Sequence, residues 1–149
     1  YNEVIGGYVE EIESLQEGQE VDIKGIDEFA GISGSGVVFR DMLKTITAKP
    51  LFVYNDEFYN HLSAVTVNNF EEGQVYYIGT GLDNCTMDAI AAKIITDAAI
   101  EWIDTEEGVE VVKREANGET YYFVMNHTDK VKNFNNIELK AYESKIMKN

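Results

Sequence analysis

Residues 63–100 limit the possible folds of this chain more than any other stretch. The run at 64–67 alternates apolar and polar side chains, and the run at 74–78 is β-branched and aromatic, so each is predicted to be a strand. The polar residues 71–73 between them end in a glycine and are typical of a turn. The sequence therefore predicts that the two strands pair as a hairpin.

A helix is predicted directly after this hairpin. Gly79-Thr80-Gly81 ends the apolar run, and Asp83 or Asn84 can then cap a helix N-terminus through a side-chain oxygen. Apolar residues recur at helical spacing up to Ile100. The expected structure is a hairpin, a glycine turn and a helix.

The charge and the cysteine content of the chain exclude several classes of protein. Twenty-seven acidic residues against 12 basic ones give a formal net charge of −15, which repels phosphate backbones and anionic membranes. We therefore expect no nucleic acid or membrane partner. One cysteine cannot form an internal disulfide, and with two distant histidines it offers no zinc spacing, so a cytoplasmic protein without a metal is expected. Because the sequence starts at Tyr1 and not at a methionine, we expect this chain to be a piece of a longer protein.

The segments before the hairpin are predicted to be mainly strands. Residues 1–30 are acidic with short apolar islands, which predicts short strands within acidic loops. The glycine-rich run at 31–36 lacks the Lys-Ser/Thr of a phosphate-binding loop and is predicted to be a surface loop. Residues 37–46 are interpreted as mostly strand, Lys49-Pro50 as an interruption, and 51–54 as a short buried strand.

The segments after the helix predict a small β unit, and a domain boundary is placed near Asp104. Residues 109–116 and 119–125 flank Asn117-Gly118, which tolerates the positive φ angles of a type I′ turn, so they predict a hairpin. Residues 137–147 alternate apolar and polar side chains and are predicted to be a third strand.

Cys85 is the first candidate for chemistry, because it lies between a predicted strand and the N-terminus of the predicted helix. A helix dipole can lower the pKa of a thiol in that position. However, Asn84 and Thr86 flank it instead of the small glycines of a nucleophile elbow, and neither His61 nor His127 is close in sequence. We interpret Cys85 as a half-buried structural thiol.

The other candidate sites also have simpler interpretations. Gly79-Thr80-Gly81 before a helix could bind a phosphate, but the third glycine of a dinucleotide motif is missing and Asp83 adds negative charge there. His61 and His127 are interpreted as solvent-facing or capping residues. A sugar ring could stack on exposed aromatic residues. These aromatic residues are Trp102, Tyr121 and Tyr122. Strand alternation places successive residues of 119–125 on opposite faces of the hairpin, so the side chains on one face are predicted to be buried in the core.

An ordered series of short motifs resembles one family along nearly the whole chain. The run AVTVNNFEEGQVYYIGTGLD at 64–83 resembles the line that closes the trimerisation domain of glycoside hydrolase family 42 β-galactosidases. Further pieces match in the same order, at 7–11, 56–59, 105–111 and 125–128. The chain departs from the family pattern after Thr128, where only DKVKNFNN precedes Ile137, so either the C-terminal β-sandwich is shortened or loop residues are missing there.

The resemblance implies an α/β fold for most of the chain. Residues 1–104 would be the C-terminal portion of a class I glutamine amidotransferase-like, flavodoxin-like trimerisation domain, and residues 105–149 a small antiparallel all-β domain. Loss of the first βα units would leave an open sheet edge and apolar surface around Val53, Val67 and Tyr77. A homo-oligomer is therefore expected, as a trimer is in the family.

The resemblance also implies that this part of a β-galactosidase is not catalytic. In the family, two glutamates of a preceding (β/α)₈ barrel cleave terminal non-reducing β-D-galactosides, and no residue of this chain matches them. We therefore expect no catalytic residue, no cofactor and a role in subunit assembly, and we identify no sugar-contacting residue. Two alternatives are a carbohydrate-binding accessory module and a divergent amidotransferase-like enzyme with a reactive Cys85.

Overall fold

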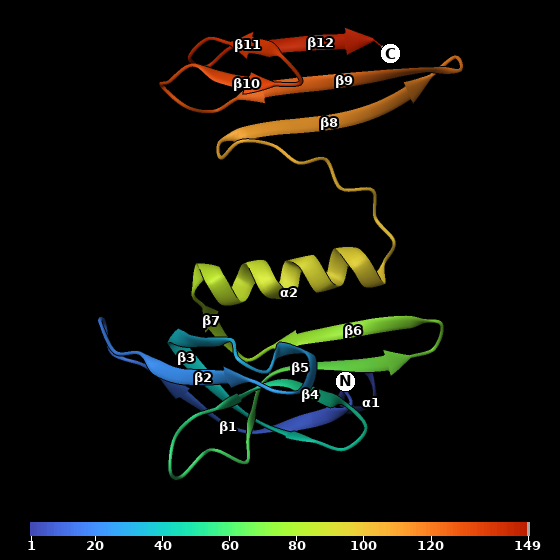
Figure 1. Ribbon diagram of the computed structural model, residues 1–149. Helices are drawn as coiled ribbons and strands as arrows, with labels where there is room; N and C mark the ends of the chain where they lie inside the picture. Colours follow the sequence, from blue (N-terminus) through green and yellow to red (C-terminus); the bar gives the residue numbers. More distant parts are fainter. Residues whose placement is uncertain (149) are drawn as a thin grey trace. The chain divides into compact units, whose positions relative to one another are not determined.

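A break in the internal contacts after Ala98 divides the protein into two units, Tyr1–Ala98 (unit 1) and Ala99–Asn149 (unit 2). The structure is a computed structural model that describes residues 1–148 (Figure 1). Each unit has its own hydrophobic core.

Unit 1 is a seven-stranded antiparallel sheet with one long helix. Its strands follow one another through short connections, which favours antiparallel pairing because a parallel pair needs a crossover of a dozen or more residues. Its elements are α1 (Asn2–Ile5), β1 (Gly7–Ser14), β2 (Val21–Gly25), a 3₁₀ turn (Asp27–Phe29), β3 (Ser33–Thr45), β4 (Lys49–Tyr54), β5 (Ser63–Phe70), β6 (Gly73–Ile78), β7 (Thr80–Leu82) and α2 (Asn84–Asp97).

Pairing among four strands of unit 1 closes a ring around the core. β3 pairs with β2, β2 with β4 and β4 with β5, and β5 returns to β3 through Leu43 and Ser63. β1 and β7 add to β3, and β6 adds to β5. The fully buried core side chains come mainly from the ring strands and include Ile23, Leu51, Phe52 and Val65.

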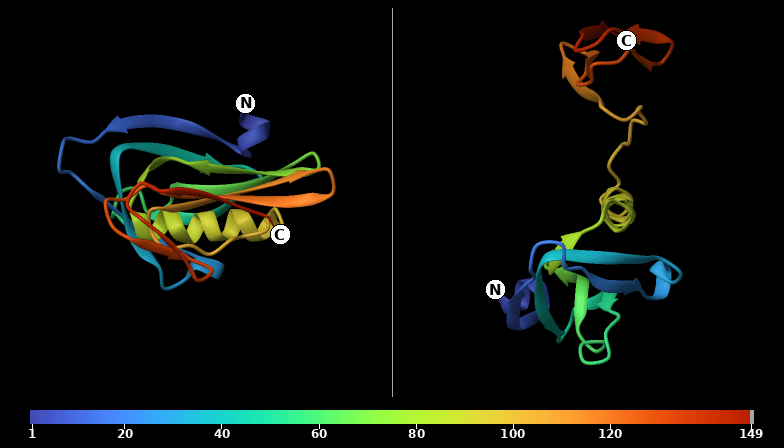
Figure 2. Two further views of the ribbon diagram at one scale, coloured as in Figure 1. Left: turned by 90° about the horizontal axis from the view of Figure 1, so that it is seen from above. Right: turned by 90° about the vertical axis from the view of Figure 1, so that its left-hand side faces the viewer.

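The structure confirms the central hairpin and the helix that follows it. β5 and β6 pair antiparallel from Phe70–Gly73 to Val65–Ile78, as the alternating pattern predicts. Asp83 is the N-cap of α2, which ends at Asp97, before the predicted end at Ile100. Figure 2 shows α2 beside the sheet of unit 1, where Ile90 is buried against the core.

Two local expectations in unit 1 are wrong because long-range strand pairing determines the structure of these segments. Within the expected surface loop at 31–36, residues 33–36 begin β3 and pair with β2. Lys49-Pro50 does not interrupt the chain but begins β4, paired with β5. Val53, Val67 and Tyr77, around which open apolar surface is expected, are each half-buried and so remain partly accessible to solvent.

The start of the chain is tied to a strand far along the sequence. The Asn68 side chain of β5 donates from Nδ2 to the carbonyl oxygens of Glu3 (3.0 Å) and Val4 (2.9 Å). Its Oδ1 accepts a hydrogen bond from Thr47. A Cβ at Gly6, where φ is +67°, would lie 2.4 Å from this amide group. Only glycine therefore fits at the end of α1.

Unit 2 is an antiparallel three-stranded sheet with a short hairpin. Its strands are β8 (Val109–Ala116), β9 (Glu119–Asn126), β10 (Lys132–Phe134), β11 (Ile137–Leu139) and β12 (Ser144–Lys148), with the sheet order β12-β9-β8 and a separate β10-β11 pair. Val109, Val124, Phe134 and Leu139 form its buried cluster.

The hairpin predicted in unit 2 is confirmed, and the single third strand is not. Asn117 (φ 54°) and Gly118 (φ 78°) have the two positive φ angles of a type I′ turn between β8 and β9. The predicted strand at 137–147 is two strands, β11 and β12, separated by a turn in which Tyr142 has φ 56°. β10, which pairs with β11, was not predicted.

The described chain is therefore mainly β, with few helices. The expected small antiparallel unit follows unit 1, whereas the helical part of the expected α/β class is limited to α2 and the short α1. No helix within residues 1–148 is long and apolar enough to cross a bilayer.

Candidate functional site

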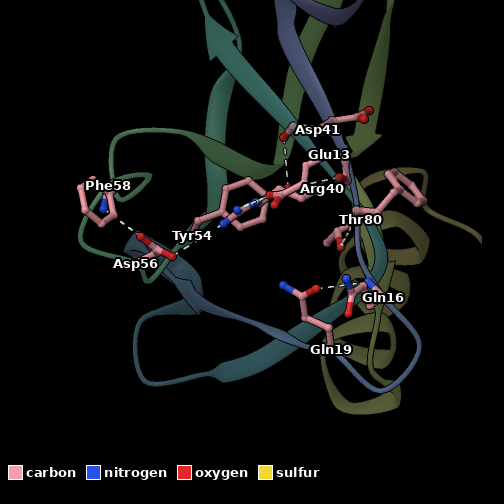
Figure 3. A network of polar contacts seen from close by, with 11 residues as sticks. Glu13, Gln16, Gln19, Arg40, Asp41, Tyr54, Asp56, Phe58 and Thr80 are labelled. Atoms are coloured by element: carbon pink, nitrogen blue, oxygen red, sulfur yellow. Dashed lines mark hydrogen bonds and ion pairs between the residues drawn. The ribbon is translucent and has the colours of Figure 1, made fainter.

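A buried arginine in β3 organises the densest polar cluster in unit 1. Arg40 is 4% exposed, and its Nε and Nη2 atoms both donate to Glu13 Oε2, with an Nε to Oε2 distance of 2.9 Å (Figure 3). Arg40 and Glu13 are direct cross-strand partners on β3 and β1. A charge-assisted pair of this kind joins the edge strand β1 to the ring.

A bulge in β3 aims Arg40 inward. The register between β3 and β7 shifts between Val37 and Arg40, and Val38 has φ 71° with an exposed side chain. A β-branched residue at positive φ is a genuine outlier. After this bulge, Arg40 and Asp41 are both buried, so successive residues of one strand contribute to buried polar contacts.

The loop between β4 and β5 closes over the guanidinium group. Asp56 Oδ2 lies 3.7 Å from Arg40 Nη1, and the ring centroid of Tyr59 lies 4.0 Å from the guanidinium carbon. Asp56 also accepts a hydrogen bond from the backbone N–H of Phe58 at 2.8 Å, which fixes the loop turn. Arg40 Nη1 makes no hydrogen bond itself. The cluster therefore anchors the loop through charge and stacking.

Asp41 is the centre of a second set of contacts beside the first. Its Oδ2 accepts a hydrogen bond from the Tyr77 hydroxyl group, and the Tyr54 hydroxyl lies 3.1 Å from the carbonyl oxygens of Asp41 and Gly79. Burial raises the pKa of Tyr54 well above its ordinary value, and the negative charge of Asp41 adds to the effect. The pKa of Tyr77 is also raised, first by burial and then by its bond to Asp41. Both phenols are neutral donors near pH 7.

The charged and phenolic side chains of the cluster are engaged in contacts with one another or with the backbone. The carboxylates of Glu13 and Asp56 both face the guanidinium group of Arg40. The phenols are committed to backbone or carboxylate acceptors. The cluster therefore has a structural role, because its contacts fix β1, β3 and the β4–β5 loop relative to one another.

Two family models match consecutive parts of the chain. The β-galactosidase trimerisation domain of glycoside hydrolase family 42 matches residues 1–101, and the β-galactosidase C-terminal domain matches residues 108–149. The chain belongs to glycoside hydrolase family 42.

Curated and solved members of family 42 resemble the chain over most of its length. β-Galactosidase BgaP of Planococcus sp. (strain L4) is 31% identical over 140 residues, which are 92% of this chain and 20% of that protein. The crystal structure of β-galactosidase from Bacillus circulans sp. alkalophilus has a TM-score of 0.87 at 26% identity, over 99% of this chain and 25% of that one. The enzyme from Rahnella sp. R3 shares the fold, with a TM-score of 0.84 at 23% identity over 99% of this chain and 24% of that one. The chain spans about a fifth of the curated relatives' length.

The structure places Cys85 of this family 42 chain at the surface. The thiol is exposed, so the expectation of a half-buried thiol is wrong. The reason is its position in the first turn of α2, where Thr86 is buried and Cys85 points away from the sheet side. His61 and His127 are exposed, and His127 Nε2 lies 2.8 Å from Glu110 Oε2.

Asp83 acts as a structural cap. Its carboxylate accepts hydrogen bonds from the N–H of Ser35 (2.6 Å), the N–H of Thr86 (3.0 Å) and the Thr86 hydroxyl (2.9 Å). These donors hold the pKa of Asp83 below its ordinary value, with the Ser35 bond as the largest cause. The anion occupies the helix N-terminus where a phosphate would bind.

The glycine turn before Asp83 contains a short strand that the sequence did not reveal. Thr80–Leu82 forms β7, and a Cβ at Gly81 would lie 2.9 Å from the carbonyl oxygen of Val37. The backbone of β7 lies so close to β3 at this point that only a residue without a side chain fits. Thr80 donates its hydroxyl to the carbonyl oxygen of Phe39 at 2.6 Å, which adds to the contact.

The aromatic residues of unit 2 divide as the strand alternation predicts. Tyr122 packs on the buried cluster around Val124, whereas Phe123 and Trp102 are exposed. Tyr121 is half-buried and donates its hydroxyl to Glu119 at 2.6 Å. Within residues 1–148, no group of three or more His, Cys, Asp or Glu side chains is placed to hold a metal ion.

Sequence reasoning missed the cluster around Arg40. In the strand predicted at 37–46, Arg40 and Asp41 interrupt a run of apolar residues. Two adjacent opposite charges flanked by apolar residues in a strand are a signal for buried, paired groups, because an isolated buried charge is very costly. The partners Glu13 and Asp56 are not evident from local sequence.

Proposed function

We propose that this chain is a non-catalytic C-terminal part of a β-galactosidase that hydrolyses terminal non-reducing β-D-galactosides. In this proposal unit 1 serves subunit assembly and structural support, in a trimer of the whole protein. The observation that carries it is the ordered match of a trimerisation domain and a C-terminal domain along the chain.

The chemistry of the buried cluster supports a role without catalysis. A retaining glycosidase needs two carboxylates about 5 Å apart, one free to attack and one able to exchange a proton. Glu13 and Asp56 are instead both committed to Arg40. We assign no residue of this chain a catalytic, cofactor-binding or metal-binding role, and the galactoside is a partner of the whole enzyme.

We further propose that unit 1 belongs to a larger domain of the whole protein. Unit 1 would complete an amidotransferase-like α/β domain together with parts of the protein outside this chain, and the domain boundary would lie near Asp104. The match to the trimerisation domain ends at residue 101 and the next match begins at 108, which supports a boundary in this interval. A cytoplasmic location agrees with the single cysteine.

The catalytic part of the proposal is tested by incubating the chain with a chromogenic β-galactoside. We expect no turnover above a control without protein, because binding alone supplies no route to cleavage. Turnover that is abolished by Glu13→Gln or Asp56→Asn would overturn the non-catalytic assignment.

The assembly part is tested by light scattering between 0.1 and 1 M salt. Unit 1 has 17 acidic and five basic residues, so self-association is opposed by charge repulsion that salt screens as the Debye length falls from ~10 to ~3 Å. We expect a dimer or trimer whose population rises with salt. A monomer at every salt concentration would contradict the assembly role.

A second candidate function is sugar binding by unit 2. A cavity of about 250 Å³ is lined by Tyr122, Phe134, Asn135, Met147 and Lys148, which combine aromatic surface with amide and ammonium groups. Aromatic rings that bind sugars need one open face, so titration with galactosides should perturb the Tyr122 ring signals in NMR spectra. Absence of any shift at millimolar galactoside would leave the assembly role as the better account.

A further inference from the structure

One face of the sheet of unit 2 is left without a covering element among the described residues. The other face carries Val109, Val111 and Val124 and packs against Phe134 and Leu139 of the β10–β11 hairpin. Because side chains alternate along a strand, the neighbours of these residues point to the opposite side. We call that side the outer face.

The strand register arranges the outer face in three cross-strand rows. The middle row is apolar, with Ile146 66% and Phe123 37% exposed and Val112 half-buried. The rows, each given in the order β8, β9, β12, are Glu110-Met125-Ser144, Val112-Phe123-Ile146 and Arg114-Tyr121-Lys148. An apolar row exposed on a sheet is a feature that proteins usually cover.

The two outer rows carry opposite charge on β8. Glu110 lies two residues before Val112 and Arg114 two residues after it, so the charges stand on either side of the apolar row. Within the described residues Arg114 is paired with no carboxylate, and Glu110 has only the exposed His127 as an ionic partner. At the β12 end of the row, Lys148 is paired with Glu119.

We propose that the outer face of unit 2 docks against the same face of a second copy of this chain. A two-fold axis running along the middle row turns one sheet over onto the other. This operation places Phe123 on Phe123 and Ile146 on Ile146 of the partner subunit. It also exchanges the two outer rows, so Glu110 of each copy faces Arg114 of the other. The face is therefore complementary to itself, as an isologous interface requires.

Charge distribution within the chain favours this site of contact. Unit 2 has 10 acidic and seven basic residues, whereas unit 1 has 17 and five, so copies repel each other less through unit 2. A three-stranded face is smaller than the ~800 Å² per partner of a standard interface, so we expect a weak dimer with a dissociation constant in the micromolar range or above. The inference does not depend on the assembly role proposed for unit 1.

Charge reversal in sedimentation velocity experiments tests the arrangement. Glu110→Arg and Arg114→Glu should each weaken the dimer about tenfold or more, because each creates two symmetry-related pairs of like charges across the interface. The double variant E110R/R114E should restore wild-type association, since opposite charges face each other again. Ile146→Asp should abolish the dimer. Because Ile146 is 66% exposed, the variant should fold like the wild type, which a melting curve checks.

Each possible result separates this inference from the assembly role of unit 1. Restoration in the double variant supports docking through the outer face. An oligomer that is unchanged in all four variants forms elsewhere, which overturns the inference and leaves the role of unit 1 standing. A wild-type chain that remains monomeric at several hundred micromolar in 0.15 M salt also overturns it.

Discussion

Replacing Arg40 tests whether the buried cluster stabilises unit 1. Arg40→Met keeps most of the side-chain volume but removes the guanidinium that contacts Glu13, Asp56 and Tyr59. Each hydrogen bond to a charged group contributes about 1.5–3 kcal/mol, and the stacking on Tyr59 about 0.5–2 kcal/mol. The gain from not burying a charge offsets part of this sum.

The expected net loss is about 2 kcal/mol of the free energy of unfolding of unit 1. The carboxylates of Glu13 and Asp56 are each 39% exposed, so water recovers much of their solvation when Arg40 is removed. For a domain of this size, such a loss lowers the melting temperature by roughly 8–16 °C. Urea unfolding followed by far-UV circular dichroism measures it.

The matched control is Arg114→Met, which changes the other arginine of the chain at an exposed position. We expect that variant to stay within about 0.5 kcal/mol of the wild type. Hydrogen exchange should also become faster at the Phe58 amide, because its acceptor Asp56 loses its anchor in Arg40→Met. Equal stability of the two variants, or a more stable Arg40→Met, would refute the argument that the guanidinium outweighs the cost of its burial.

Two further perturbations test the turn of unit 2 and the cap of α2. Gly118→Val forces a β-branched residue to φ 78° and should cost about 1 kcal/mol or more; an unchanged melting curve would contradict the type I′ turn. Because the folded-state pKa of Asp83 is lowered, its contribution to stability is present above the unfolded pKa near 4 and is lost as the pH falls through the folded value. Asp83→Asn, which can still cap the helix, should remove that acid-dependent part of the unfolding free energy while retaining most stability at pH 7. An identical pH dependence in the variant would exclude the carboxylate as its source.

Local patterns predicted the elements whose partners are close in sequence. The β5–β6 and β8–β9 hairpins and the start of α2 follow from alternation, turn residues and a capping aspartate within about 20 residues. β7 and the beginning of β3 could not be found in this way. Both are built from glycine-rich sequence and exist because they pair with strands elsewhere.

The candidate site depended on contacts that no local pattern shows. Glu13 and Arg40 are 27 residues apart, and Asp56 comes from a third segment. The prediction of one strand at 137–147 is wrong for another reason. The alternation of apolar and polar residues continues through the turn between β11 and β12, where the backbone changes direction. Periodicity alone does not distinguish one strand from two.

The Asn68 side chain also sets an order of events when unit 1 folds. It binds the carbonyl groups of Glu3 and Val4 from 65 and 64 residues away, so the first turn of the chain is held by a residue made much later. The entropy of closing so long a loop must be overcome before this contact forms. During synthesis residues 2–5 therefore lack this anchor until β5 has left the ribosome. We expect Asn68→Ala to accelerate unfolding more than it slows refolding, which is the behaviour of a contact that forms after the transition state.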